Sequence, residues 1–175
     1  MKALLLISVA VFGGLYAAGL RVNTSPSIPV GVYRLTDEAI TRGRYVLLCP
    51  PDTPLFQEAK RRGYVPAGFC PGNLGYLMKQ VAATAGDVVS HTPEGLNVNG
   101  VLLPASRELP FDGAQRPLPH WEPSHYPLKD DELLLMTDQS ALSFDARYFG
   151  VLRQQQVRHV ITPVLVWRKT NEAPS

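Results

Sequence analysis

The sequence predicts a mostly β domain that follows a single N-terminal membrane helix. An uncharged run of eighteen residues, from Ala3 to Leu20, predicts the membrane helix. Sixteen prolines and fourteen glycines among 175 residues, with few long periodic stretches, favour strands and loops over a helical bundle. A chain of this length suits one domain with a substantial hydrophobic core.

The uncharged N-terminal run is long enough to cross a bilayer. As a helix it would span roughly 27 Å. Lys2 and the amino terminus precede it, which favours a cytoplasmic N-terminus and an exported remainder. A cleaved signal peptide is the competing interpretation, because Ala17 and Gly19 form a small-residue cleavage site. We expect three segments: a membrane anchor over residues 1–20, a folded domain over 21–168 and a disordered tail over 169–175.

Local patterns predict the elements that follow the anchor. Short apolar runs rich in β-forming residues predict strands at 30–35, 45–49, 76–82, 88–90, 132–136 and 157–167. The dipeptide Asn99-Gly100 between apolar arms predicts a hairpin. A helix is predicted from Thr53 to Gly63, with threonine as N-cap, proline in the first turn and basic residues in the last. Residues 104–127 hold six prolines and predict a long irregular surface loop.

Composition limits the partners and the metal chemistry. A net charge of +2 with 18% charged residues implies no basic patch of the size that nucleic acid requires. Two cysteines, Cys49 and Cys70, without an HExxH motif do not suit a zinc site, and we expect no cofactor. In an oxidising compartment the two cysteines are expected to form a disulfide. Two separate buried thiols are the alternative.

The stretch NTSPSIPVG, residues 23–31, holds a candidate nucleophile. Pro26 and Pro29 fix their own φ angles and favour extended backbone at the residues before them. Ser27 therefore lies on a stiff segment, and a nucleophile must meet a carbonyl in one geometry. A serine hydroxyl also needs a base to activate it. A proline-rich linker is the alternative interpretation.

A candidate base lies in YLMKQVA, residues 76–82. Strand alternation places Leu77, Lys79 and Val81 on one face. If that face is buried, desolvation lowers the pKa of the lysine and makes it a plausible general base. A lysine on an edge strand that extends its amine to water is the alternative.

The stretch SFDARYFG, residues 143–150, supplies candidate supporting groups. Ser143, Asp145 and Arg147 alternate and would share a face in an extended chain. The hydroxyl can then orient the lysine amine, while the carboxylate and the guanidinium form a charge-assisted pair. An ordinary surface ion pair in a loop is the alternative.

The order of these motifs resembles the type I signal peptidase superfamily. S-x-S-I-P comes first, then M-K-x-V with G-D seven residues beyond the lysine, then S-x-D-x-R-Y-F-G. Within that superfamily, NTSPSIPVGVY, RGRYVLLCPP, GYxxAGFCPG and SFDARYFG resemble the conjugative-transfer peptidases. The likeness runs from the anchor to Trp167 and implies a signal-peptidase-like β domain.

The resemblance implies a serine endopeptidase with a Ser–Lys dyad, in which Ser27 is the nucleophile and Lys79 the general base. The supporting residues that it implies are Ser143, which orients the lysine, Asp145 and Arg147, which brace the site, and Ser25, which completes the oxyanion hole with the Ser27 N–H. Such a site needs no histidine, and we interpret the four histidines as structural or solvated: His91, His120, His125 and His159.

Two departures from the superfamily pattern concern the surroundings of the dyad. Pro26 stands where many signal peptidases carry glycine, so oxyanion binding must depend on the Ser27 N–H and Ser25. The segment TDQSAL, residues 137–142, replaces the usual G-D-N-R-x-N approach and changes the surroundings of Asp138.

The resemblance also implies a substrate and a location. It implies maturation of a conjugative pilin precursor, a hydrophobic membrane polypeptide, by removal of a C-terminal tail and head-to-tail cyclisation, for DNA transfer by type IV secretion. The enzyme would be a single-pass protein of the bacterial inner membrane, with a periplasmic catalytic domain and no direct nucleic-acid binding. General signal peptidase activity and a non-catalytic anchored component of the transfer apparatus are the alternatives. The membrane segment and the absence of a DNA-binding half disfavour a self-cleaving repressor.

Overall fold

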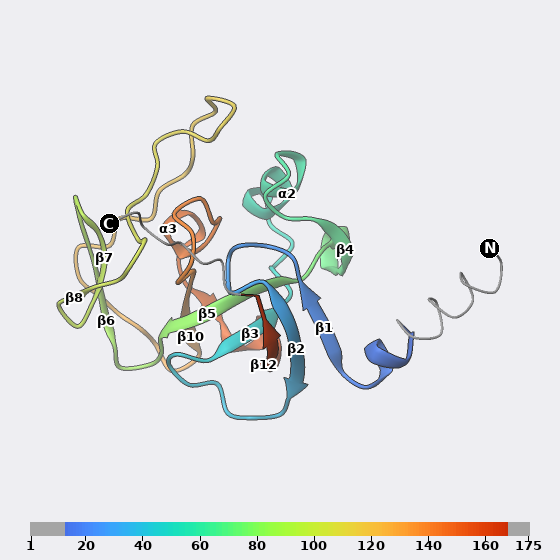
Figure 1. Ribbon diagram of the computed structural model, residues 1–175. Coiled ribbons are helices and arrows are strands. Elements are labelled where there is room, and N and C mark those ends of the chain that lie inside the picture. The colour runs from blue at the N-terminus through green and yellow to red at the C-terminus, as the bar shows by residue number, and fades with distance from the viewer. Residues whose placement is uncertain (1–12, 168–175) are drawn as a thin grey trace, which may run out of the picture.

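Two antiparallel sheets form the framework of the computed structural model, which describes residues 13–167 (Figure 1). The larger, seven-stranded sheet has the order β1-β2-β12-β3-β5-β10-β11, and the smaller, four-stranded sheet has the order β8-β7-β6-β9. The larger sheet comprises β1 (Leu20–Asn23), β2 (Gly31–Thr36), β3 (Tyr45–Leu48), β5 (Leu77–Ala83), β10 (Glu132–Met136), β11 (Leu152–Arg153) and β12 (Val157–Val166). The smaller sheet comprises β6 (Val88–Thr92), β7 (Gly95–Val98), β8 (Val101–Leu102) and β9 (Tyr126–Pro127). The predicted mostly β fold is confirmed.

The helices after the N-terminal segment are short. The remaining elements are α2 (Pro54–Arg61), α3 (Ala146–Phe149), the short strand β4 (Ala67–Cys70) and two 3-10 turns (Pro71–Asn73 and Gln154–Gln156). α2 begins after Thr53, carries Pro54 in its first turn and is followed by Gly63 with φ +83°. The helix predicted from caps and basic residues is therefore confirmed to within two residues at each end. The β4 strand, β1, β9, β11 and α3 have no counterpart among the predicted elements.

Strand alternation divides the core between the two faces of the larger sheet. On β3, Val46 and Leu48 point to one face and pack with Phe56 of α2, while Leu47 points to the other face. Val46 lies directly opposite Lys79 on β5. Because paired residues on antiparallel strands share a face, Lys79 lies on the face that carries the larger core.

The chain enters the larger sheet earlier than the sequence predicts. Residues 13–17 are helical, Gly19 has φ +75°, and Leu20 already pairs with Arg34 of β2. Glycine at a positive φ ends the helix and turns the chain toward β2, so the predicted helical run does not continue to Leu20. None of the helices between residues 13 and 167 is both long and apolar enough to span a bilayer. Residues 1–12 of the expected anchor and the expected tail lie outside the described residues.

The structure also tests the predicted hairpin, the strand that contains Pro163 and the predicted loop over residues 104–127. Asn99 and Gly100 have φ angles of 52° and 81° and join β7 to β8, so the predicted hairpin is confirmed. Pro163 does not end β12, because the pairing with β2 shifts register between Pro163 and Leu165 and the strand continues past this irregularity. The predicted loop over residues 104–127 is irregular until β9, which pairs with β6.

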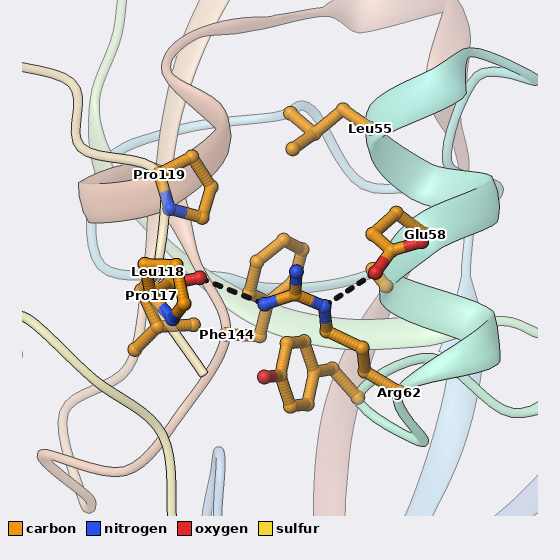
Figure 2. A pocket seen from close by; sticks show the side chains of 9 residues that line it. Leu55, Glu58, Arg62, Pro117, Leu118, Pro119 and Phe144 are labelled. Carbon is orange, nitrogen blue, oxygen red and sulfur yellow. Dashed lines mark hydrogen bonds and ion pairs between the residues drawn. The ribbon is translucent and has the colours of Figure 1, made fainter. Parts of the chain in front are cut away.

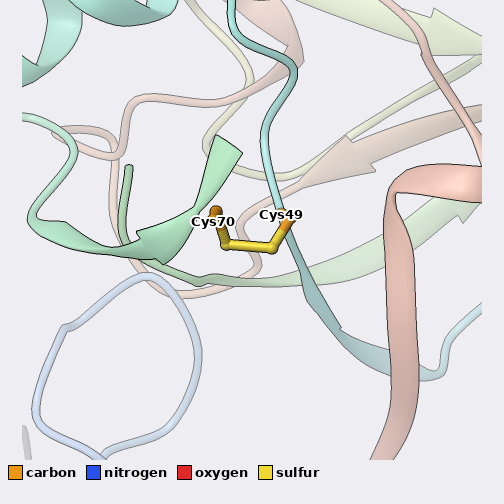
Figure 3. Close-up of a disulfide and its surroundings, with 2 residues drawn as sticks. All are labelled: Cys49 and Cys70. Carbon is orange, nitrogen blue, oxygen red and sulfur yellow. A yellow bond between two sulfur atoms is a disulfide. The ribbon is translucent and has the colours of Figure 1, made fainter. Parts of the chain in front are cut away.

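A disulfide ties the segment that carries α2 to the larger sheet (Figure 3). It joins Cys49, immediately after β3, to Cys70, at the end of β4, with 5.4 Å between their Cα atoms. The expected disulfide is confirmed, and the alternative of two separate thiols is wrong. The bridge closes a loop that includes α2 and Tyr64.

Candidate active site

The loop between β1 and β2 is organised by one buried side chain, Asn23, which is 5% exposed. Its Nδ2 donates hydrogen bonds to the carbonyls of Ser25, Ile28 and Pro29, at 2.8, 3.0 and 3.1 Å. Its Oδ1 accepts the Ser25 N–H at 3.0 Å, and Tyr33 Oη donates to the Pro29 carbonyl at 2.5 Å. Asn23 was not among the predicted site residues, although an asparagine side chain commonly bonds the backbone two residues further on, as it does here.

This loop brings Ser27 to Lys79 and Ser143. Lys79 Nζ lies 3.0 Å from Ser27 Oγ and 2.6 Å from Ser143 Oγ. The two serine oxygens are themselves 3.0 Å apart, so the three groups form a hydrogen-bonded triangle. The expected contact between Ser27 and Lys79 is confirmed as geometry.

Lys79 is buried, with 2% of its surface exposed, because β5 lies between β3 and β10 inside the sheet. Burial lowers the pKa of its amine from 10.5 to about 8, the Asp145 carboxylate opposes this shift, and the Arg147 guanidinium adds to it. Roughly a tenth of the amine would be neutral at pH 7, compared with well under a thousandth at the ordinary pKa. The alternative of an edge-strand lysine that reaches water is therefore wrong.

Asp145 and Arg147 form a fully buried bidentate pair, with Nε–Oδ1 and Nη2–Oδ2 distances of 2.8 and 2.9 Å. The guanidinium also donates to the carbonyl of Ser143 at 2.8 Å, as well as to the carbonyls of Ala141 and Arg107. The pair thus holds the backbone that carries the Ser143 hydroxyl. The alternative of a surface ion pair is wrong.

The extended conformation assumed for this motif is also wrong. Asp145 is the N-cap of α3, and its side chain accepts the Arg147 N–H at 3.2 Å. Aspartate is a favoured N-cap because its oxygen satisfies a free N–H in the first turn. The helical turn after Asp145 brings Arg147 back to the Ser143 carbonyl.

The Ser25 hydroxyl accepts a hydrogen bond from the Ser27 N–H, the backbone group that would otherwise be free to bind an oxyanion. The Ser27 N–H donates to Ser25 Oγ at 3.2 Å, and Ser25 Oγ lies 3.1 Å from Ser27 Oγ. The Ser25 hydroxyl must therefore turn away before the Ser27 N–H can bind a substrate oxygen. Thr137, which the sequence did not single out, donates to the Ser27 carbonyl at 2.8 Å and fixes the orientation of this peptide.

The altered TDQSAL segment places Asp138 away from the dyad. Asp138 Oδ2 accepts a hydrogen bond from Tyr45 Oη at 2.6 Å, and burial followed by this bond raises the pKa of Tyr45. Tyr45 lies opposite Gln80, which points to the other face of β5 from Lys79. Among the described residues, Asp138 Oδ1 is buried without a hydrogen-bond partner.

The dyad opens onto a groove of about 510 Å³, which we call the catalytic groove. Its walls come from residues 21–25 and Ser27, from Tyr64 and Pro66 after α2, and from Phe144. Within residues 13–167, no hydrogen bond or ion pair joins a histidine to the triangle, and no group of three or more histidine, cysteine or acidic residues could hold a metal ion.

On a mostly β domain, the triangle brings a buried lysine amine into hydrogen-bond contact with two serine hydroxyls, and a neutral amine can act as a base toward such a hydroxyl. The sequence model of the family described as Signal peptidase, peptidase S26, matches residues 1–166, and the chain belongs to this family. Within the family it is of the TraF type, as its relatives show.

Two relatives from Escherichia coli, each named Plasmid transfer protein TraF, are 50% and 48% identical to the chain. The alignments cover 88% and 89% of this chain and 86% and 88% of those proteins. The Probable conjugal transfer protein TraF of Sinorhizobium fredii is 36% identical over 95% of this chain and 85% of its own length. A solved signal peptidase I from Enterococcus faecalis V583 is 19% identical with a TM-score of 0.40, over 73% of this chain and 100% of that one.

Proposed function

We propose that the chain is a membrane-anchored serine peptidase and acyl transferase that matures a conjugative pilin. It removes a C-terminal tail and joins the new C-terminus to the N-terminus of the same pilin. The observation that carries this proposal is the triangle of Ser27, Lys79 and Ser143 around a buried amine with a pKa of about 8. The chain aligns over most of the length of relatives that are named as plasmid and conjugal transfer proteins. This similarity supports a substrate from the conjugative-transfer apparatus.

The first half of the reaction forms an acyl-enzyme. The neutral amine of Lys79 takes the hydroxyl proton of Ser27 as Oγ attacks the scissile carbonyl carbon. The amine donates an N–H to Ser143 Oγ, which directs its lone pair toward Ser27. The Ser27 N–H and the turned Ser25 hydroxyl donate to the oxyanion. The C–N bond then breaks, and the departing amine takes the proton from the Lys79 ammonium.

The second half of the reaction releases the product. The N-terminal amine of the pilin attacks the ester carbonyl and loses a proton to Lys79. The ester C–O bond breaks, Ser27 Oγ recovers that proton, and a new peptide bond closes the ring. Water in place of the amine would give the trimmed linear chain instead.

We also propose that the domain lies on the periplasmic side of the inner membrane, with the uncharged residues before Gly19 as its anchor. The Cys49–Cys70 disulfide supports an oxidising compartment, and Lys2 before the uncharged run supports a cytoplasmic N-terminus. β1 leads from that run directly into the Ser27 loop. The dyad would therefore lie near the bilayer surface, where a hydrophobic pilin emerges.

Mass spectrometry of the pilin precursor encoded with this chain tests the proposal. We expect wild-type protein to yield a product one water lighter than the trimmed linear chain, and Ser27→Ala and Lys79→Ala to yield only precursor. Ser90→Ala, on β6 in the smaller sheet, is the matched control and should process normally. Intact processing by Ser27→Ala would support a non-catalytic role instead. Preference for an ordinary exported precursor in a competition assay would support a general signal peptidase.

A further inference from the structure

We propose that a second pocket, beside Ser143, binds a large apolar side chain of the substrate within two residues of the scissile bond. This inference rests on the proposed peptidase function and adds a specificity site to it. We call the site the leucine pocket, because Leu109, Leu118 and Leu142 form its rim, above a floor of Phe144 and Tyr148. It has a volume of about 210 Å³.

The leucine pocket lies next to the reacting groups. Ser143 lines it, and Ser143 Oγ is 3.0 Å from Ser27 Oγ. Tyr64 and Phe144 line both the leucine pocket and the catalytic groove. Consecutive residues of an extended peptide are only about 3.3–3.6 Å apart along the chain. A peptide whose carbonyl reaches Ser27 therefore has a side chain within reach of this pocket.

The walls of the leucine pocket select apolar groups. The rings of Phe144 and Tyr148 stack with centroids 5.7 Å apart, and the Tyr64 ring lies 5.3 Å from Phe144. Leu142 is 82% exposed beside the dyad, so a bound apolar side chain would remove its surface from water.

The one ionisable carboxylate in the lining, Asp112, is already satisfied. It accepts hydrogen bonds from Tyr64 Oη, from the Ala114 and Arg116 N–H groups and from the Arg116 side chain. A charged substrate group would therefore find no free partner there. The pocket suits side chains of the size and polarity of leucine, methionine or phenylalanine.

The loop over residues 109–118, which carries two of the three rim leucines, is held in place before any substrate binds. Arg62, at the end of α2, donates to the Pro117 carbonyl at 2.7 Å while its Nε contacts Glu58 (Figure 2). The Tyr64–Asp112 hydrogen bond joins the loop to the wall of the catalytic groove. A preorganised pocket loses little conformational entropy on binding. The free energy of apolar contact therefore contributes to the preference for a large apolar side chain.

The test uses peptides that span the cleavage site mapped on the pilin. Each of the four positions nearest the scissile bond, two on either side, is varied singly between alanine and leucine. With full-length wild-type protein, we expect leucine at one position to raise kcat/KM at least roughly tenfold over alanine. Binding to full-length Ser27→Ala protein should show the same preference. Leu118→Trp, which fills the pocket, and Leu142→Ala, which lowers its rim, should bring the leucine-to-alanine ratio toward one. Leu102→Ala, an exposed leucine of β8, should leave the ratio unchanged.

Two results separate the failure of this inference from the failure of the proposed function. If wild-type protein cleaves the peptides with no preference at any position, the leucine pocket is not a substrate site, although the peptidase function stands. A preference that survives both Leu118→Trp and Leu142→Ala also overturns the inference. If wild-type protein cleaves neither peptide nor pilin, the proposed function itself is wrong.

Discussion

Asn23 holds the loop that carries Ser27, the proposed nucleophile, more directly than Pro26 and Pro29 do. Pro26 and Pro29 restrict φ, but the Asn23 amide ties three carbonyls and one N–H of the loop to a single buried point. The position of Ser27 relative to Lys79 therefore depends strongly on this amide, together with the Thr137 hydroxyl.

We expect Asn23→Ala to lower kcat about 100-fold, because a displacement of about 1 Å at a nucleophile has an effect of that order. The pH at half-maximal activity should not change, since the burial of Lys79 is unaltered. Asn23→Asp should not restore activity, because a carboxylate cannot donate to the three carbonyls. Steady-state kinetics across a pH series measure both quantities, with Asn97→Ala on β7 as control. Unchanged kcat in Asn23→Ala would contradict the assignment.

Lys79 determines the expected pH dependence. In the proposed mechanism the neutral amine is the active form, so we expect activity to rise with pH and to reach half its maximum near pH 8, the pKa of the buried amine. Below that value, kcat/KM should fall about tenfold per pH unit. Lys79→Arg should be as inactive as Lys79→Ala, because a guanidinium stays protonated. A midpoint near the ordinary lysine value of 10.5, or an active Lys79→Arg enzyme, would refute a buried lysine base.

At the scale of single elements, α3 shows how a short helix braces the site. Its N-cap Asp145 and its residue Arg147 are both fully buried, and their pairing leaves neither charge unsatisfied. We expect Arg147→Met to destabilise the fold by roughly 3–5 kcal/mol, since it leaves a buried carboxylate alone. Arg153→Met, which breaks the exposed pair with Asp131, should cost less than about 1 kcal/mol. Chemical denaturation compares the two variants, and equal losses would contradict this account.

The disulfide stabilises the segment that forms one wall of the catalytic groove. It closes a separation of 21 residues between the end of β3 and the end of β4, for which the chain-entropy estimate is about 3 kcal/mol. The Cys49→Ala/Cys70→Ala double variant should lose stability of that order and should bind substrate more weakly, because Tyr64 and Pro66 lie within the closed loop. Denaturation with and without reductant measures the effect in the wild type. Stability that does not respond to reductant would be evidence against a structural role.

At the scale of the whole molecule, burial of the Lys79 amine lowers the free energy of unfolding. The folded pKa of about 8 lies below the ordinary value of 10.5, so the unfolded chain binds the extra proton between these pH values. Stability therefore rises with pH through this window, and below about pH 8 the full penalty applies. The shift of 2.5 units (10.5 minus 8) corresponds to roughly 3 kcal/mol.

We therefore expect Lys79→Met to be more stable than the wild type at pH 7, by up to roughly 3 kcal/mol. The advantage should shrink between pH 8 and 10.5 and vanish above it, because both states of the wild type are then neutral. Denaturation midpoints measured from pH 6 to 11 test this, with Lys129→Met as a control on a lysine outside the core. A Lys79→Met protein less stable than the wild type at every pH would show that the triangle stabilises the fold.

Local sequence signals were enough to predict the mostly β class, the α2 helix and the Asn99-Gly100 hairpin. Each of these depends on neighbouring residues, because alternation, caps and turn dihedrals act over a few positions. The motif around Ser143 predicted that Asp145 and Arg147 would pair but not the conformation that pairs them, since the Asp145 cap and the buried pair favour α3 over an extended chain.

Only the tertiary structure decided how these residues meet. Ser27, Lys79 and Ser143 are separated by 52 and 64 residues along the chain, and their contact depends on the pairing of β5 with β3 and β10. That pairing also buries Lys79, which no local pattern could distinguish from an edge lysine. Asn23 and Thr137 support the Ser27 loop through hydrogen bonds that exist only in the folded chain. Burial and long-range hydrogen bonds are properties of the packed chain, so the sequence indicates candidate groups, while packing determines the distances between them and the pKa of Lys79.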